Sequence, residues 1–291
     1  MESKTQFTFL IVSDTHDNVQ NVRKVVDWYN SNDKPHIDYI ICAGDIATVP
    51  TGSQHLPEFV ERVHPTITAI LQELEKITPH IIYIPGNHDP YTLFQEQSAP
   101  KFTEHSVNLH KTYMKLADDL YIIGNGGSTP VLQGAKYQVR NTPFADLDFS
   151  KVMYNGYPYN HEGDSNYKLS DVDMETNIKE VITRVKEENA NARMILLSHN
   201  GPLYTWTNVM VYDNEVLYLG SERIGELMFA ENNLFLNIHG HCHTGRGSVN
   251  LTDDKTVVNP GALASGTFAM CVVKKNTSGV WELNETSLFV V

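Results

Sequence analysis

The chain has 291 residues, of which 41% are hydrophobic and 20% are charged, a composition typical of a soluble globular protein. It contains no run of about 18 or more apolar residues, so we predict no membrane span. Its 35 Asp and Glu residues against 22 Lys and Arg residues give a formal net charge of −13, which argues against a nucleic-acid-binding surface, because such surfaces need clustered positive charge.

The first part of the chain alternates short apolar runs with amphipathic segments. Apolar, β-branched runs at 7–14, 37–45 and 80–89 predict buried strands. The amphipathic segments 18–30 and 57–77 predict helices between them. Strand, helix, strand, helix, strand in this order is typical of a parallel sheet with crossover helices.

The second part of the chain returns to the same buried-strand pattern. The stretch 120–127 predicts a strand that ends in a glycine turn, and 170–190 predicts a polar helix. Residues 192–201 and 233–241 predict two more buried strands. The tail contains KTVVNPG, FAMCVVKK and VWELNETSLFVV, which predict antiparallel strands that close a second sheet.

Between these parts, roughly 128–168 is rich in Tyr, Asn and Gly and shows little periodicity. We predict a loop-rich insertion there that overhangs a site. No segment has the composition of a linker, so we predict a single domain over residues 1–291.

Metal-capable or proton-carrying side chains follow five of the apolar strands. They are Asp14, His16, Asp45, Asn87, His88, His199, His241 and His243. The carboxyl ends of parallel strands lie along one edge of a sheet, where ligands bind in α/β folds. We therefore expect these residues to converge on one pocket.

All of these residues except His88 supply the candidate metal ligands: two carboxylates, one amide oxygen and four imidazoles. A single Zn²⁺ normally takes four ligands. Seven ligands with one bridging carboxylate fit two cations about 3.5–4 Å apart, an arrangement used for phosphate displacement. The mixed oxygen and nitrogen set favours Mn, Fe, Zn or Mg over a thiolate-based structural zinc. Cys242 lies between two of the ligands, and we predict that it is buried and points away.

The motifs SDTH, GD, GNHD, SHNGP and GHCH, in this order, resemble those of the calcineurin-like metallophosphoesterase superfamily. Together with VVNPGA at 257–262 they span nearly the whole chain. Each motif is weak alone, but five in order, each ending a strand, form a strong signal. The resemblance implies an α/β fold in which two mixed β-sheets pack face to face, flanked by helices.

The resemblance also implies how the ligands are divided between two divalent metal ions. The division is Asp14, His16 and His243 for the first ion, Asn87, His199 and His241 for the second, and Asp45 as the bridge. A bridging water or hydroxide would complete both shells and attack the phosphorus.

Four further residues near the motifs have predicted roles. His88 directly follows a ligand, and imidazole titrates near neutral pH, so we predict a general acid or phosphate-stabilising group; the alternative is a structural turn residue. Asp17 is predicted to cap the helix that begins near Asn18. Asp89 could orient the site through a hydrogen bond or an ion pair. His239 is predicted to be buried or to lie next to a metal ligand, rather than to bind a metal ion itself.

The substrate is predicted to be a small-molecule phosphate ester. The stretch GDIATVPTG lacks the Asp and Arg that follow the bridging Asp in Ser/Thr protein phosphatases, which argues against that subgroup. Tyr91 and the tyrosines of 153–159 could stack on a base, and Arg246 or Arg140 could bind a phosphate; ordinary loop or structural roles are the alternatives. We favour a phosphodiester or nucleotide-type substrate.

Three alternatives to a phosphodiesterase stay open: a phosphomonoesterase of the same fold, a non-catalytic protein-binding scaffold, and a structural metal protein. Intact ligand positions argue against the scaffold, and the lack of thiolates argues against a structural site.

The sequence also predicts a compartment. The first residues, MESKTQFTFLIVSD, lack a signal-peptide layout. The three cysteines, Cys42, Cys242 and Cys271, are odd in number and far apart, so we predict no disulfide framework. Both features predict a reducing, cytoplasmic location.

Overall fold

The structure is a computed structural model that describes residues 4–31, 34–50, 56–95, 99–128, 174–203, 205–212 and 215–291. The predicted insertion 128–168 lies outside the described residues except for Ser128, and Arg140 and the tyrosines of 153–159 lie outside them too. Among the described helices, none is both long and apolar enough to cross a membrane. All three cysteines are buried and have free thiols.

The first sheet has six strands in the order β14-β13-β1-β2-β3-β4. Their bounds are β1 (Gln6–Val12), β2 (Tyr39–Cys42), β3 (Ile81–Tyr83), β4 (Ser106–Asn108), β13 (Thr267–Lys275) and β14 (Trp281–Val290). Strands β1 to β4 are parallel, as the alternation of strands and helices predicts. β13 pairs antiparallel with both β1 and β14.

The second sheet has six strands in the order β11-β12-β10-β7-β6-β5. Their bounds are β5 (Thr112–Ala117), β6 (Leu120–Asn125), β7 (Arg193–Ser198), β10 (Leu234–Ile238), β11 (Gly247–Thr252) and β12 (Lys255–Asn259). The four inner strands are parallel, and the two edge strands are antiparallel to their neighbours. A separate hairpin joins β8 (Val209–Tyr212) to β9 (Glu215–Tyr218).

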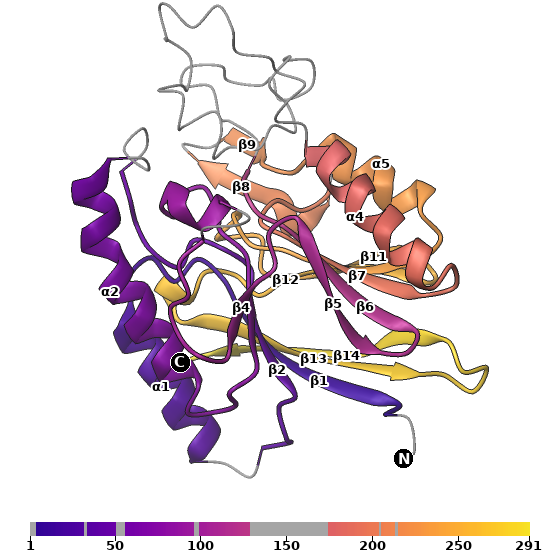
Figure 1. Cartoon of the computed structure of the whole chain (residues 1–291), viewed down its shortest axis with the longest axis horizontal. Helices are drawn as coiled ribbons and strands as arrows, with labels where there is room; N and C mark the ends of the chain where they lie inside the picture. Colours follow the sequence, from indigo (N-terminus) through magenta and orange to yellow (C-terminus); the bar gives the residue numbers. More distant parts are fainter. Residues whose placement is uncertain are drawn as a thin grey trace, which may run out of the picture.

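The two sheets pack face to face between two helix layers. Helices α1 (Val19–Asn30) and α2 (Pro57–Leu74) cover the first sheet, and α4 (Met174–Glu188) and α5 (Glu222–Ala230) cover the second (Figure 1). Three apolar clusters fill the spaces between these four layers. The predicted fold class, two mixed sheets flanked by helices, is confirmed.

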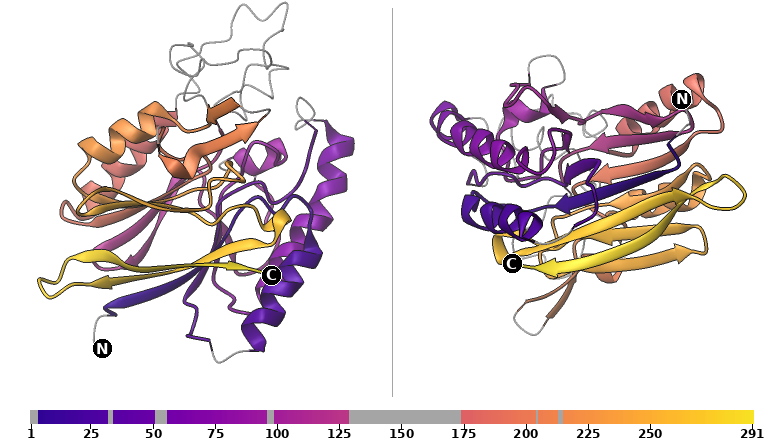
Figure 2. Two further views of the ribbon diagram at one scale, coloured as in Figure 1. Left: turned by 180° about the vertical axis from the view of Figure 1, so that it is seen from behind. Right: turned by 90° about the horizontal axis from the view of Figure 1, so that it is seen from below.

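The tail of the chain departs from the prediction in part. β12, from KTVVNPG, lies in the second sheet and pairs antiparallel with β11, as predicted. β13 and β14 are antiparallel, but they extend the first sheet rather than closing the second, and Figure 2 shows them (yellow) beside the indigo β1. The backbone N–H groups of Leu263 and Ala264 donate to the carbonyls of Ser13 and Asp14, at 2.8 and 3.0 Å. These bonds hold the chain at the end of β1, so the next strand begins beside it.

The start of α1 also departs from the prediction. Asn18, not Asp17, is the N-cap, and its side chain accepts a hydrogen bond from the backbone N–H of Asn21 at 3.0 Å. The Asp17 carboxylate instead accepts from the backbone N–H of Thr48 at 3.1 Å. Asp17 therefore ties the turn after β1 to the turn after β2.

Candidate metal centre

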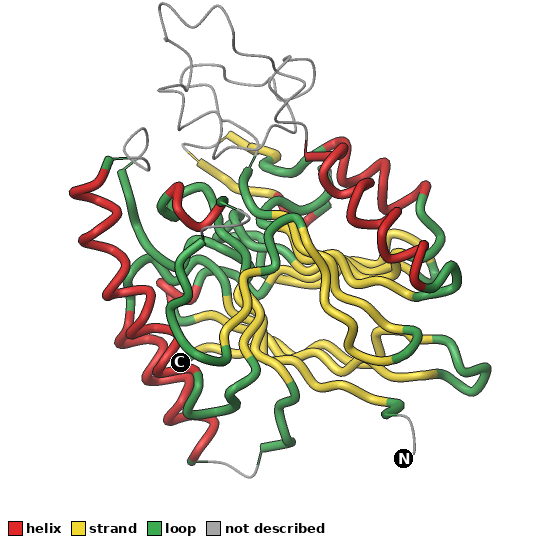
Figure 3. The backbone as a smooth tube through the Cα atoms, in the orientation of Figure 1, coloured by secondary structure: helices red, strands yellow, loops and turns green. Residues whose placement is uncertain are grey.

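The eight predicted site residues lie in the turns that follow five strands. The residues are Asp14 and His16 after β1, Asp45 after β2, Asn87 and His88 after β3, His199 after β7, and His241 and His243 after β10. These strands come from both sheets rather than from one, and their ends meet opposite the N-terminus, where the loops gather in Figure 3. His16 Nε2 lies 3.1 Å from His243 Nε2, across 227 positions of sequence. The cluster is therefore built by the stacking of the sheets.

The chain turns sharply as it leaves these strands. Several of the residues have backbone in the left-handed region, which costs non-glycine residues about 1–3 kcal/mol. They are Asp14 (φ 50°), His16 (φ 47°), Asp45 (φ 51°) and His241 (φ 63°). Gly44, at φ 96°, adds a steric requirement, because a Cβ there would lie 2.4 Å from His199 Nδ1.

Asp14, His16 and His243, the outer group, offer ligand atoms within 4.8 Å of one another. Asp14 Oδ1 lies 3.1 Å from His243 Nε2, and Asp14 Oδ2 accepts from the Ser13 hydroxyl at 2.6 Å. The Asp14 side chain is buried, whereas that of His243 is 46% exposed. Burial opposes ionisation of Asp14, but the hydrogen bond from His243 and the charge of His199 lower its pKa. The same hydrogen bond raises the pKa of His243.

Asp45, His199 and His241, the inner group, also offer ligand atoms within 4.8 Å of one another. His199 Nδ1 donates to the carbonyl of Ala43 at 2.7 Å, so its Nε2 faces the group. That Nε2 lies 3.3 Å from Asp45 Oδ2 and 3.1 Å from Asn87 Oδ1. Burial lowers the pKa of His199, but Asp45 outweighs it and raises the pKa to about 9. With this pKa, His199 carries a second proton on Nε2 at neutral pH. A cation bound by the group would replace that proton.

His241 gives the clearest sign that the inner group fits a metal ion. Its Nε2 is buried and finds no hydrogen-bond partner among the described residues. Burial lowers the pKa of His241 to about 3, so the ring stays neutral. A buried, unpaired polar atom is costly, and a neutral imidazole nitrogen is a good ligand. The residues present therefore fit a divalent cation.

Asp45, a member of the inner group, also lies close to the outer group. Its Oδ2 is 3.3 Å from His199 Nε2 and 3.8 Å from His16 Nε2. Its Oδ1 accepts from the backbone N–H of His88 at 2.7 Å. Burial opposes ionisation, but the nearby imidazoles hold the pKa of Asp45 well below its usual range.

His88 and Asp89 occupy the turn after β3. The His88 ring lies 5.2 Å from the His16 ring, and its Nδ1 is 3.4 Å from the carbonyl of Val49. The buried Asp89 carboxylate accepts from the backbone N–H groups of Gly86, Ile46 and Ala47 at 2.8, 3.2 and 2.8 Å. Burial and the charge of Asp45 raise the pKa of Asp89 to about 7. Asp89 thus joins the turn of Asp45 to the turn of Asn87.

The structure also describes four other residues that the sequence singles out. His239 is fully buried, outside both groups, with Nε2 2.9 Å from the Thr207 hydroxyl, as predicted. Cys242 is buried, also as predicted. Tyr91 begins a short 3₁₀ helix, η1 (Tyr91–Phe94), and is half-buried, and Arg246 is exposed just after the last ligand.

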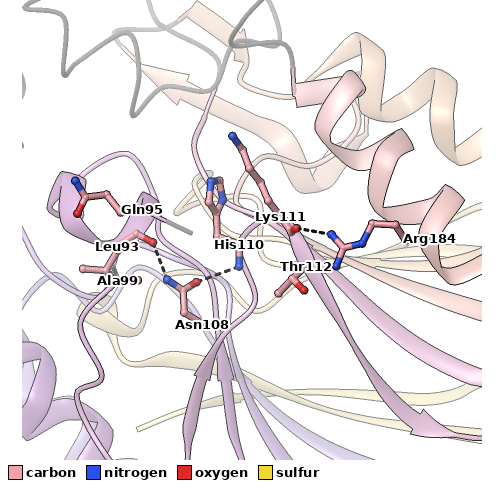
Figure 4. A pocket seen from close by; sticks show the side chains of 8 residues that line it. All are labelled: Leu93, Gln95, Ala99, Asn108, His110, Lys111, Thr112 and Arg184. Carbon is pink, nitrogen blue, oxygen red and sulfur yellow. Dashed lines mark hydrogen bonds between the residues drawn. The ribbon is translucent and has the colours of Figure 1, made fainter. Parts of the chain in front are cut away.

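A cavity of about 310 Å³ lies apart from both groups. Its lining is Leu93, Gln95, Ala99, Asn108, His110, Lys111, Thr112 and Arg184 (Figure 4). The side chain of His110, one of these lining residues, accepts a hydrogen bond from the backbone N–H of Gly126 at 2.9 Å. None of the candidate metal ligands lines this cavity.

The family model described as calcineurin-like phosphoesterase matches residues 7–245. No curated protein matches the chain in sequence. The structure of TT1561 of Thermus thermophilus superposes with a TM-score of 0.56 at 15% identity, covering 97% of this chain and 99% of that one.

Two further solved structures are similar. A putative 5'-nucleotidase from Staphylococcus aureus has a TM-score of 0.56 at 12% identity, covering 99% of this chain and 54% of that one. The phosphopantetheinyl hydrolase PptH from Mycobacterium tuberculosis has a TM-score of 0.52 at 14% identity, covering 89% of this chain and 91% of that one. At these identities the likeness shows the fold alone.

Proposed function

The chain belongs to the calcineurin-like phosphoesterase family, and from that premise we propose that it hydrolyses a phosphodiester or nucleotide-type small molecule with two metal ions. Membership makes it a metal-dependent phosphoester hydrolase; the two ions, the residue roles and the substrate are the proposal. The main support for it is the pair of three-residue donor groups, in which Asp45 of the inner group also lies close to His16 of the outer group.

In this proposal the outer group holds one divalent ion, and the inner group with Asn87 holds the other, with Asp45 shared. The buried Nε2 of His241 supports this, because a metal ion would satisfy it. Bound there, two cations would lower the pKa of a water molecule and neutralise charge on the phosphate oxygens. Mn, Fe, Zn and Mg all suit these donors.

His88 is proposed to assist the leaving group. With Nδ1–H directed at the carbonyl of Val49, the imidazolium form of His88 carries its second proton on Nε2, and that proton would pass to the departing oxygen, leaving the ring neutral. The bond from its backbone N–H to Asp45 fixes the turn that carries the ring. The imidazole is thereby held beside the outer group without being a ligand.

Asp89 is proposed as a positioning residue. Its three backbone hydrogen bonds fix the turns of Asp45 and Asn87 relative to each other, so both oxygen donors arrive in place when the chain folds. The single domain over residues 1–291 and the cytoplasmic location stay predictions from the sequence.

A substrate screen with metal analysis tests this function. The purified protein with added Mn²⁺ is assayed on bis(p-nitrophenyl) phosphate, p-nitrophenyl phosphate, cyclic nucleotides and dinucleotides, with Asp45→Asn as the inactive control. We expect two bound ions and faster turnover of diesters. Preference for the monoester would replace the diesterase with a phosphomonoesterase, and bound metal without any turnover would favour a scaffold or structural metal protein.

A further inference from the structure

Trp206 lies in a short 3₁₀ helix, η3 (Trp206–Asn208), in the loop that follows the candidate ligand His199. At 78% exposure it is the most exposed large hydrophobic residue in the described part of the chain. A single exposed apolar side chain is ordinary. Trp206 is unusual because the described residues next to it in this turn, Thr205, Thr207 and Asn208, are buried.

A buried hydrogen-bond network holds the turn that carries Trp206. The hydroxyl of Thr205 and the side-chain amide of Asn208 both donate to the carbonyl of Pro202 at 2.9 Å. The Thr205 and Thr207 hydroxyls lie 2.8 Å apart. Thr205, Thr207 and Asn208 are all buried, so among residues 205–208 only the Trp206 side chain is exposed to solvent.

The same network fixes this turn against the loop of His241 and His243. The Asn259 side-chain amide donates to the carbonyl of Thr207 and to the carbonyl of Cys242, both at 2.9 Å. The Thr244 hydroxyl donates to the carbonyl of Val209 at 3.2 Å. Asn259 therefore joins the residue after Trp206 to the peptide between the two candidate ligands.

We propose that Trp206 is a stacking surface for the base of a nucleotide-type substrate whose phosphate lies at the metal centre. This inference rests on the proposed function and names its substrate class. A chain with net charge −13 repels anionic substrates at long range, so an uncharged contact on a turn that is bonded to the loop of His241 and His243 suits such a substrate. Stacking on an indole accepts any base, because every base has a π-face.

The kinetic test compares two esters with the same leaving group: the p-nitrophenyl ester of thymidine 5'-monophosphate and methyl p-nitrophenyl phosphate. We expect Trp206→Ala to raise KM about 10-fold for the nucleoside ester, with kcat unchanged, and to leave KM for the methyl ester unchanged. Trp206→Phe should keep part of the effect. Phe229→Ala, which removes another exposed aromatic, should change neither KM. An equal rise in KM for both esters would overturn the proposal.

A fluorescence titration tests the same contact without turnover. Thymidine 5'-monophosphate added to the metal-loaded protein should quench tryptophan emission, and Trp206→Phe should abolish that quenching, since Trp28 is partly buried and Trp281 fully buried. Quenching that survives in Trp206→Phe would refute the stacking role. If neither ester is hydrolysed, the proposed function fails, while the titration still decides the role of Trp206.

Discussion

The inner and outer groups each offer one carboxylate and two imidazoles, yet they are held differently. Asp45 and His199 of the inner group are buried, and backbone groups fix both: the N–H of His88 and the carbonyl of Ala43. The outer group ends in His243, whose side chain is 46% exposed and whose contacts are Asp14 and His16. Donors fixed by the core cost little to order, so we expect the inner group to bind its ion more tightly.

Asp45→Asn would remove the carboxylate that lies close to histidines of both groups, and we expect the largest effect from this change. The amide keeps the volume but loses the charge between the imidazoles of both groups, so both ions should be lost. Activity should fall by at least about 1,000-fold, in the range seen when a central catalytic group is lost. Metal analysis and turnover measure this, with Asp38→Asn as a control at another buried carboxylate. A variant that keeps two ions would contradict the bridging role.

His88→Ala should lower turnover without removing the metal ion from either group. Its ring lies beside the outer group and is proposed to supply a proton, so turnover of substrates with poor leaving groups should fall about 100- to 10,000-fold. Both ions should remain, and p-nitrophenyl esters should be less affected. His105→Ala, an exposed histidine elsewhere, serves as the control. Retained turnover of poor leaving groups would eliminate the acid role.

His241→Ala and His243→Ala test the comparison directly, since the two residues lie on one loop but in different groups. Each should weaken a different ion by at least about 10- to 100-fold, because even second-layer partners of metal ligands have effects of that size. Calorimetric metal titration should show one tight site left in His243→Ala and one weak site left in His241→Ala. Loss of the same ion in both variants would refute the division.

Asp89→Asn should have the smallest effect and act on the inner group. The amide cannot accept all three backbone hydrogen bonds, so the free energy of unfolding should fall by about 1–3 kcal/mol. Affinity for the inner ion should fall about 10-fold through the displaced turn. Thermal melts and metal titration measure both, and unchanged values would show that the turns are fixed by other contacts.

Much of the fold is readable from local pattern. The apolar runs at 7–14, 37–45 and 192–201 predict β1, β2 and β7, and the amphipathic segment 57–77 predicts α2. These predictions succeed because burial of one face or of both faces leaves a regular pattern of apolar residues within a short segment. The sequence does not predict β4 (Ser106–Asn108), because a strand of three residues shows too little periodicity. The helix α5 and the edge strands β5 and β11 were missed for the same reason: their apolar patterns are short or mixed.

The sequence by itself determined which side chains stand at the strand ends, because the residue type and the end of an apolar run are both local properties. Only the tertiary structure decided which sheet each strand joins and which donors meet. His16 contacts His243 because two sheets stack face to face, and β13 joins β1 because the turn at Leu263 is bound to Ser13. Those outcomes depend on contacts between residues more than 200 positions apart. The hydrophobic periodicity of a short segment carries no information about such contacts.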